Sequence, residues 1–262
     1  MRIKMRIPEK RIIDLKDLIK KEKVVTVERL SKAFNISPIT VRRDLAMLDR
    51  KGFLTKVHGG AIYKDLIEPE PVFSEQIRLH QEEKSEIAKE ASKRINDGDS
   101  IILESGTTCL AIVKHLMDKK NIKVSTAGIP LANELWNLSM IKKDMEVSVS
   151  GGVMRPNSSI YVGPHAVNYF KKINADIAFV SPVGVSVERG ISTATDFDAE
   201  LMKSIIDCSK KTILICDSTK FGKYSYINVA PLTAFAEIIT DKALGKDYYK
   251  KIKDSGIKIT LV

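Results

Sequence analysis

The feature that most constrains the fold is a regular alternation of short apolar runs with amphipathic stretches after Asp99. Apolar runs suited to strands occupy residues 100–104, 123–126, 146–150, 176–181, 212–217, 236–240 and 258–261. Stretches with helical spacing lie between them, for example at residues 109–117, 131–138, 164–172, 199–209 and 246–255. This alternation predicts an α/β domain whose parallel sheet is covered by helices on both faces.

The first quarter of the chain carries nearly all of the excess positive charge. Residues 1–60 hold 16 Lys and Arg against 7 Asp and Glu, whereas residues 61–262 hold 27 against 26. This asymmetry predicts a basic head that binds a polyanion, attached to a nearly neutral body with another task. Charge alone leaves open the alternative of a basic solvated surface without a partner.

Length and composition restrict the class of protein further. A chain of 262 residues predicts about two domains, and 44% hydrophobic with 29% charged residues is the composition of a globular protein. The basic amino terminus lacks the apolar segment of a secretory signal, and no apolar run approaches the roughly 18 residues of a membrane span. Cys109, Cys208 and Cys216 have no metal-ligand spacing. We therefore expect a cytoplasmic protein without a metal or cofactor.

Residues 8 to about 60 carry the signals of three helices in order. The first helix is predicted to begin at Pro8, and the second follows a cap at Thr26. The third begins with a cap at Ser37 and a proline at Pro38, and it ends near Gly52. Two short helices joined by a turn of about three residues predict a helix-turn-helix.

The third helix is predicted to have a packed side and a basic side. Val41, Leu45 and Leu48 share one arc of the helix and should pack on the first two helices. The opposite arc suits insertion into a major groove, with Ile39, Thr40 and Arg43 at base edges and Ser37 and Arg42 at phosphates. A strand at residues 53–57 and the following glycine-rich loop predict a wing. The predicted DNA-binding set is Ser37, Pro38, Ile39, Thr40, Arg42, Arg43, Lys56 and His58.

Two alternatives remain for members of this set. The adjacent Arg42 and Arg43 could form an ordinary solvated helix face, and His58 could be only a turn residue. The ordered combination of caps, break, amphipathic helix and wing is what makes the pattern specific.

The head resembles the winged helix of DeoR-type bacterial transcription regulators. The matching positions are Arg11, Leu30, Phe34, Ser37, the run 40–45, Leu48, Gly52 and the run 57–61. The resemblance implies sequence-specific operator binding, with the helix after Ser37 in the groove.

Four loops at the predicted carboxyl ends of strands form a second group of candidate residues. Ligands of open parallel sheets bind at this edge, and glycine turns at helix amino termini offer donors to anions. The loops contain Glu104–Thr108, Gly151-Gly152, Gly184 and Asp217–Lys220. Taken singly, each of these loops could be plain turn or bulge chemistry.

The body resembles the DeoR-type effector domain, which is related to ribose-5-phosphate isomerase. The match runs in order through residues 105–108, 151–152, Gly163, Gly190, Ala199-Glu200 with Lys203, and 217–222. The resemblance implies that a phosphorylated sugar binds the predicted effector set. Ser105, Gly106, Thr107 and Thr108 would hold the phosphate, and Lys220 would neutralise it. Glu104, Asp217 and Glu200 would contact sugar hydroxyls, and Gly151, Gly152 and Gly184 complete the set.

Three loops differ from the family pattern. Glu104 stands where the family usually has Asp, Thr126-Ala127-Gly128 replaces Thr-Asn-Ser, and Ser181-Pro182 precedes Gly184 in place of a more glycine-like turn. These differences leave the identity of the sugar open, and also whether effector binding is retained.

The predicted organisation is a winged helix-turn-helix domain at residues 8–63, a linker at 64–80, and a Rossmann-like α/β effector domain at 81–262. The predicted function is a DNA-binding transcription regulator, a repressor of carbohydrate metabolism genes modulated by a phosphorylated sugar. The expected partners are double-stranded operator DNA, the sugar phosphate and a second copy of the chain, with no membrane. The alternative is a sugar-phosphate isomerase with an accessory head, because Glu104, Glu200 or Asp217 could act as a general base beside Lys220.

Overall fold

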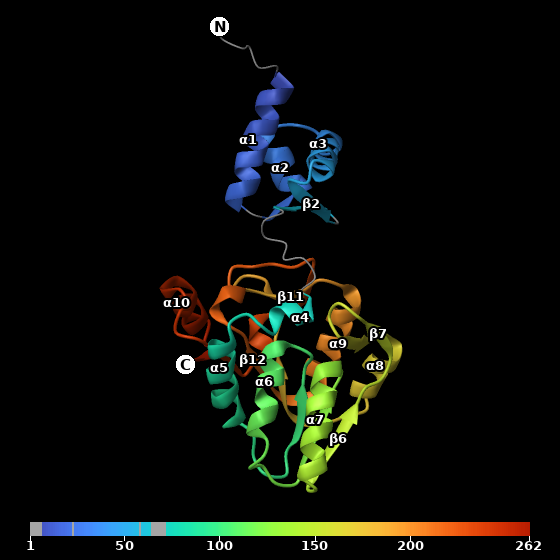
Figure 1. The fold of residues 1–262 in the computed structure, drawn as a ribbon. Coiled ribbons are helices and arrows are strands. Elements are labelled where there is room, and N and C mark those ends of the chain that lie inside the picture. Colours follow the sequence, from blue (N-terminus) through green and yellow to red (C-terminus); the bar gives the residue numbers. More distant parts are fainter. Residues whose placement is uncertain (1–6, 23, 58, 64–71) are drawn as a thin grey trace. The chain divides into compact units, whose positions relative to one another are not determined.

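The computed structural model describes residues 7–22, 24–57, 59–63 and 72–262. The chain divides into two compact units, Met1–Ile67 and Glu68–Val262 (Figure 1). Each unit has a hydrophobic core of its own, so each is described by itself. Among the described residues no helix is long and apolar enough to cross a membrane.

The first unit is a winged helix-turn-helix. It contains the helices α1 (Ile7–Glu22), α2 (Val27–Phe34) and α3 (Pro38–Arg50), and its strands β1 (Val24–Thr26), β2 (Leu54–Val57) and β3 (Gly60–Tyr63) pair antiparallel in the order β1-β3-β2. The predicted caps are present, because Thr26 Oγ1 accepts from the Arg29 amide at 3.1 Å and Ser37 Oγ accepts from the Thr40 amide at 3.2 Å. Strand β1 was not predicted, since three residues are too few for a periodic pattern.

The core of the first unit fixes which side of α3 faces outward. Val41, Leu45 and Leu48 are buried, as predicted, and they pack with Leu15 of α1 and Leu30 of α2. Gly60 allows β3 to approach β1, because a Cβ at this position would lie 2.1 Å from the Val25 carbonyl oxygen. The hairpin therefore packs beside the helices as a wing.

The second unit is built on a parallel sheet. Among the described residues its order is β15-β14-β12-β9-β4-β5-β6, with every neighbouring pair parallel. These strands correspond to the seven predicted runs, with bounds β4 (Ser100–Leu103), β5 (Ile122–Thr126), β6 (Met145–Val149), β9 (Ala175–Val180), β12 (Ser209–Ile215), β14 (Glu237–Thr240) and β15 (Lys258–Leu261).

Helices cover both faces of this sheet, as predicted (Figure 1). Successive strand residues enter different cores, so that Ile101 and Leu103 pack with α5, α6 and α7 while Ile102 packs with α8, α9 and α10. The helices are α5 (Gln81–Ser92), α6 (Thr107–Ile112), α7 (Ile129–Ile141), α8 (Pro164–Phe170), α9 (Asp196–Asp207) and α10 (Lys246–Asp254). The fold class expected from the sequence is confirmed.

Short strands that the sequence analysis did not predict lie outside the main sheet. Strands β10 (Gly184–Ser186), β11 (Gly190–Thr193) and β13 (Ile227–Ala230) form one small sheet, and β7 (Val153–Arg155) pairs with β8 (Ile160–Val162). The loop between β7 and β8 contributes Ser158 to the pocket described below.

Part of the predicted linker is ordered on the second unit. Residues 73–76 form the short helix α4 (Phe73–Gln76), and the Phe73 amide donates to the Asn157 carbonyl oxygen at 2.9 Å. Residues 64–71 lie outside the described residues. The segment 72–80 therefore packs on the second unit, which a proline-rich composition could not indicate.

Candidate functional site

The predicted DNA-binding residues of α3 lie on its outward side. Ser37, Pro38, Arg42 and Arg43 are exposed, and Thr40 is half-buried. Ile39, at the first turn of α3, is 76% exposed. The structure thus brings an apolar tip and two guanidinium groups together at the amino-terminal half of one helix.

The remaining members of the predicted set belong to the wing. Lys56 is exposed on β2, and its amide donates to Asp49 Oδ1 at 3.4 Å. His58 lies outside the described residues, so its assignment stays a prediction. Gly59 has a φ of +79°, in accord with the permissive turn expected after β2.

An ion pair fixes the orientation of α3. Arg11 of α1 donates from Nε to Asp44 Oδ2 at 3.0 Å and from Nη2 to Asp44 Oδ1 at 3.3 Å. Asp44 is only 7% exposed, so its carboxylate depends on this two-pronged partner. Arg11 and Asp44 therefore hold the helix in place from behind.

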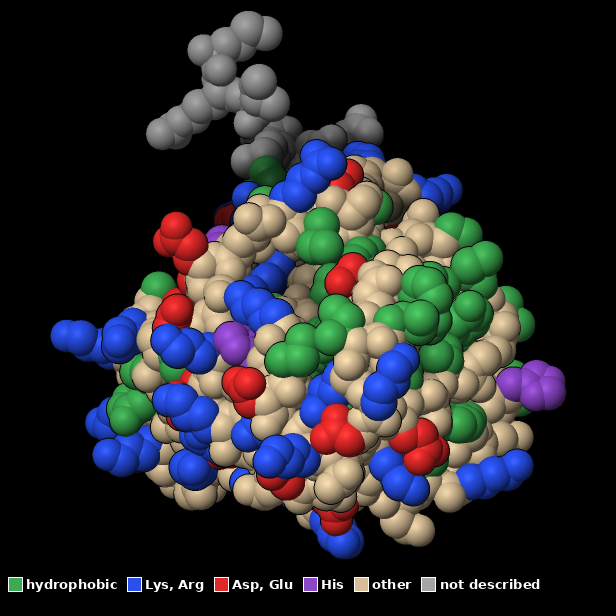
Figure 2. Space-filling view, turned by 60° about the horizontal axis from the view of Figure 1, so that its bottom comes forward, with side chains coloured by type: hydrophobic (Ala, Val, Ile, Leu, Met, Phe, Trp, Pro, Cys, Tyr) green, Lys and Arg blue, Asp and Glu red, His purple; other side chains and the backbone are tan. Residues whose placement is uncertain are grey.

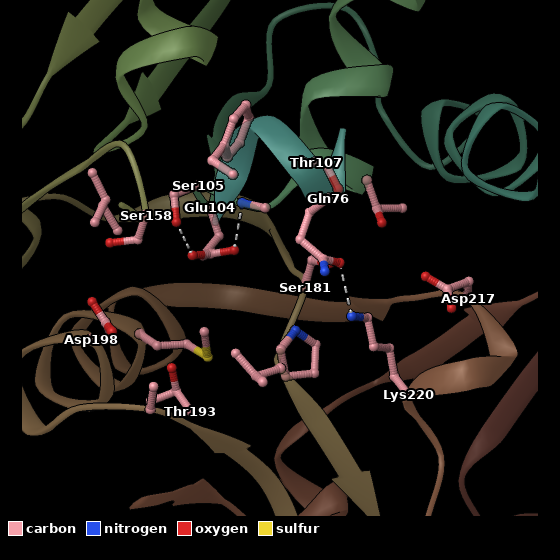
Figure 3. Close-up of a pocket in the computed structure, with 18 of the residues that line it drawn as sticks. Gln76, Glu104, Ser105, Thr107, Ser158, Ser181, Thr193, Asp198, Asp217 and Lys220 are labelled. Carbon is pink, nitrogen blue, oxygen red and sulfur yellow. Dashed lines mark hydrogen bonds between the residues drawn. The ribbon is translucent and has the colours of Figure 1, made fainter. Parts of the chain in front are cut away.

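A pocket lies at the carboxyl ends of β4, β9 and β12 in the second unit (Figure 3). The sheet order reverses between β4 and β9, and crevices at such positions are where open α/β sheets bind ligands. The cavity has a volume of about 100 Å³. Of the predicted effector set, the pocket is lined by Glu104, Ser105, Gly106, Thr107, Thr108, Asp217 and Lys220.

Four predicted effector residues are not among the described residues that line the pocket: Gly151, Gly152, Gly184 and Glu200. Two of the glycines permit close backbone packing, since a Cβ on Gly152 would lie 2.6 Å from the Val162 carbonyl oxygen and one on Gly184 2.5 Å from that of Lys223. Gly151 adopts a φ of +62°, and a Cβ at this position would meet open space.

Glu200 is exposed on α9, and Asp198 of the same helix lines the pocket in its place. Two residues along an α-helix are separated by about 200° of rotation, which puts their side chains on opposite sides. Glu200 therefore lies on the same helix as a pocket-lining residue but on the other side of that helix.

Glu104 organises the first loop from within. Its carboxylate accepts hydrogen bonds from the Gly106 amide at 2.9 Å and from the Ser105 hydroxyl. Burial raises the pKa of the Glu104 carboxyl above its ordinary value, and these hydrogen bonds oppose that change. The Gly106 amide, which the sequence assigned to phosphate, therefore already binds the chain's own carboxylate.

One end of the pocket carries two lysines. Lys220 Nζ donates to Gln76 Oε1 at 3.3 Å (Figure 3). Lys84 of α5 is 5% exposed and donates to the carbonyl oxygens of Gln76 at 2.6 Å and Leu79 at 2.7 Å. Burial lowers the pKa of the Lys84 ammonium, while the charge of Asp217 raises it. Both lysines thus contact the segment around α4.

The opposite end of the pocket carries carboxylate and hydroxyl side chains. Figure 3 shows Asp198, Thr193 and Ser158 on the side away from Lys220. Asp198 Oδ2 accepts from Arg155 Nη1 and from Thr195 Oγ1, both at 2.8 Å. Asp198 Oδ1 and Ser158 Oγ are buried without a hydrogen-bond partner among the described residues.

Sequence reasoning missed the pocket residues that come from other segments. Gln76 falls in the segment assigned to the linker, and Lys84 in a polar helix without a site motif. Ser158 follows a strand too short to predict. Two missed residues had a usable signal. Ser181 belongs to the loop noted above as differing from the family pattern, and Asp198 lies two residues from the chosen Glu200.

Cysteines and metal-binding groups contribute no further candidate site. Cys109 is buried and its Sγ donates to the Phe179 carbonyl oxygen at 3.4 Å, while burial raises the pKa of its thiol well above the ordinary value. Cys109 is therefore a packing residue of the hydrophobic core. Among the described residues no cluster of His, Cys, Asp or Glu could hold a metal ion.

The two units define a class of protein, namely a winged-helix DNA-binding protein with an α/β sensor domain. Residues 11–66 match the DeoR-like helix-turn-helix domain, and residues 79–242 match the DeoR C terminal sensor domain. The chain belongs to the DeoR family of DNA-binding transcription regulators, which confirms the resemblance seen in the sequence.

Individual relatives agree with this assignment. The chain is 31% identical to the HTH-type transcriptional regulator GolR of Listeria innocua, over 93% of this chain and 94% of the relative. It is 28% identical to the HTH-type transcriptional repressor GlcR of Bacillus subtilis, over 96% and 95%. A solved ribose-5-phosphate isomerase in complex with phospho-erythronic acid aligns with 55% of each chain, at 17% identity and a TM-score of 0.41. The relatives support a regulator and not the alternative of an isomerase.

Proposed function

We propose that this protein is a cytoplasmic repressor of carbohydrate metabolism genes, released from or modulated at its operator by a phosphorylated sugar. The observation that carries the proposal is the outward side of α3. It presents Ile39 and two exposed arginines while Arg11 and Asp44 fix the helix from behind. A helix held in this way can enter a major groove without first being ordered.

We assign base contacts to Ile39, Thr40 and Arg43, because an apolar tip can meet a thymine methyl group and Arg can bond guanine in bidentate fashion. Ser37, Pro38, Arg42 and the wing residues Lys56 and His58 would position the duplex through its backbone. Since such domains commonly bind two half-sites, the protein is proposed to act as a homodimer or a larger homo-oligomer.

An exposed apolar surface is consistent with an oligomer. Figure 2 shows hydrophobic side chains gathered in one area of the face in view. Trp136 and Met140, one turn apart on α7, are 59% and 57% exposed, and Val153 is 65% exposed. Large exposed apolar groups of this kind often mark contacts between proteins.

The proposed effector is bound with its phosphate at the lysine end of the pocket. Lys220 and Lys84 supply positive charge there, and the loop residues Thr107 and Thr108 supply hydroxyl groups to the pocket. Ser105 of the same loop lies on the side of Ser158 and donates its hydroxyl to Glu104 (Figure 3). Asp217 is 1% exposed and accepts from the Thr219 amide at 3.2 Å, so it shapes the loop that carries Lys220.

Coupling to the operator is proposed to run through α4. A phosphate that binds Lys220 competes with Gln76 for the same ammonium group, and Gln76 belongs to the first described helix after residues 64–71. The ligand thereby alters how firmly the start of the sensor unit is held. Linkage requires only that the ligand bind the two arrangements with different affinity.

DNA titration tests the operator assignment. A labelled duplex from upstream of the protein's own gene and a scrambled duplex of equal length are titrated with wild type and with Arg43→Ala. We expect selective binding by wild type and reduced selectivity in the variant. Equal affinity of wild type for both duplexes, repeated across candidate operators, would contradict sequence-specific binding.

A further inference from the structure

Two buried polar atoms at the end of the pocket away from Lys220 lack hydrogen-bond partners. Ser158 Oγ and Asp198 Oδ1 are both buried and unpaired among the described residues, and both residues line the cavity. Leaving such atoms unpaired costs free energy, and the cost is recovered if a bound molecule completes the hydrogen bonds. The pair therefore points to a ligand group at this place.

The environment of Asp198 defines what that group must be. Arg155 and Thr195 both hold Oδ2, so the orientation of the carboxylate is fixed and Oδ1 is left as an acceptor only. The Asp198 side chain is 12% exposed, which limits compensation by solvent. An acceptor without a donor calls for a hydroxyl or an amine, and it disfavours a second phosphate or a carboxylate.

Ser158 further restricts which ligand group can bind at this end of the pocket. A serine hydroxyl can both donate and accept, so one ligand hydroxyl can donate to Asp198 Oδ1 and accept from Ser158 Oγ. Figure 3 shows the two residues on the same side of the pocket, opposite Lys220 and Gln76. The two ends thus have opposite requirements, an anion at the lysines and a neutral donor at Asp198.

We propose that Ser158 and Asp198 are the specificity-determining residues of the effector site. They recognise a hydroxyl group remote from the phosphate and thereby select polyhydroxylated monophosphates over bisphosphates and phosphorylated acids. This inference rests on the proposed effector function and adds to it the part of the ligand that these residues recognise.

The chain offers a matched control for Ser158. The neighbouring Ser159 is not among the described lining residues, and its hydroxyl already donates to the Pro156 carbonyl oxygen at 3.3 Å. Ser158→Ala and Ser159→Ala remove the same group from adjacent positions of one loop. Only the first removes a group that the ligand is proposed to use.

Calorimetric titration of the full-length protein tests the inference. The probes are ribose 5-phosphate, fructose 6-phosphate, fructose 1,6-bisphosphate and inorganic phosphate. For the monophosphate that binds wild type most tightly, Ser158→Ala is expected to raise Kd by about 3–10-fold and Asp198→Asn by about 10–100-fold. Inorganic phosphate should bind both variants and Ser159→Ala as it binds wild type. Fructose 1,6-bisphosphate should bind wild type at least about tenfold more weakly than fructose 6-phosphate, and Asp198→Asn should narrow that difference.

The possible failures are distinguishable. If wild type binds none of the four probes, the proposed effector function and the inference both fall. If wild type binds a monophosphate and both variants bind it equally well, the effector function stands and the inference is overturned. If both variants also lose inorganic phosphate binding, the substitutions disturb the pocket as a whole, and the inference is overturned as well.

Discussion

Replacement of Glu237 tests how a helix that lines the pocket is held on the sheet. Glu237 of β14 has no exposed side-chain surface. Its oxygens accept from Arg94 at 2.7 and 3.1 Å, from Thr260 at 2.7 Å and from Lys258 at 3.1 Å. Arg94 follows α5, and α5 carries Lys84 of the pocket. The interaction therefore fastens a pocket-bearing helix to the sheet.

The size of the effect follows from the pKa of Glu237. Burial alone would raise this pKa, but hydrogen bonds from Arg94, Thr260 and Lys258 outweigh burial and lower it from 4.5 to about 2. A difference of about 2.5 in pKa corresponds to about 3 kcal/mol, and screening at the exposed Lys258 reduces this to about 2–3 kcal/mol. Because the folded-state pKa is lowered, this stabilisation is present above pH 4.5 and is lost as the pH falls towards 2.

The assay is urea denaturation of wild type and Glu237→Gln at a series of pH values from 7 to 3. We expect the variant to lose about 2–4 kcal/mol of unfolding free energy at pH 7, since Arg94 also loses one of its two charged partners and keeps only Glu90. Between pH 5 and 3 the stability of wild type should fall more steeply than that of the variant. The control is Glu146→Gln, whose partner Lys123 lies 3.4 Å away with both side chains more than 60% exposed, and it should change little. Parallel pH profiles for wild type and Glu237→Gln would show that an ionised Glu237 does not stabilise the folded state.

Three further predictions concern the DNA-binding unit. Arg43→Ala should weaken specific binding by roughly 1–3 kcal/mol and relax the preference at one base position; a base-substitution series that shows unchanged preference would remove Arg43 from the base contacts. Operator affinity should fall steeply with salt, because association releases counterions from the DNA; a flat dependence between 50 and 200 mM salt would contradict the phosphate contacts. Arg11→Ala should destabilise the first unit by about 1–3 kcal/mol, because Asp44 is left buried and unpaired. Amide hydrogen exchange in α3 should increase in this variant; unchanged exchange would show that the ion pair does not hold the helix.

The sheet of the second unit was predictable because its strands are buried on both faces. Such strands are continuous apolar runs, and all seven runs chosen from the sequence became strands of one parallel sheet. The small sheets were not predictable, since β7, β8 and β10 have three residues each and follow no clear period. Strand β1, which also has three residues, was not predicted for the same reason.

The pocket was predictable only where a loop directly follows a strand. Glu104–Thr108 and Asp217–Lys220 were found in this way, because the carboxyl ends of parallel strands meet at one edge. Gln76, Lys84 and Ser158 reach the pocket from segments that only tertiary packing brings there. The glycines at 152 and 184 show the converse, because a glycine required for close packing looks in sequence like one required for a ligand.

Operator titration in the presence of effector tests whether the pocket and the DNA-binding helix are coupled. The monophosphate that binds wild type most tightly is added to the complex of the protein with its preferred upstream duplex, and the DNA dissociation constant is compared for wild type and Lys220→Ala. We expect the ligand to change the DNA dissociation constant by about 5–150-fold for wild type and much less for Lys220→Ala, and we expect the two proteins to bind DNA nearly equally without ligand. If a saturating ligand leaves the operator affinity of wild type unchanged, the proposed coupling between pocket and operator is contradicted.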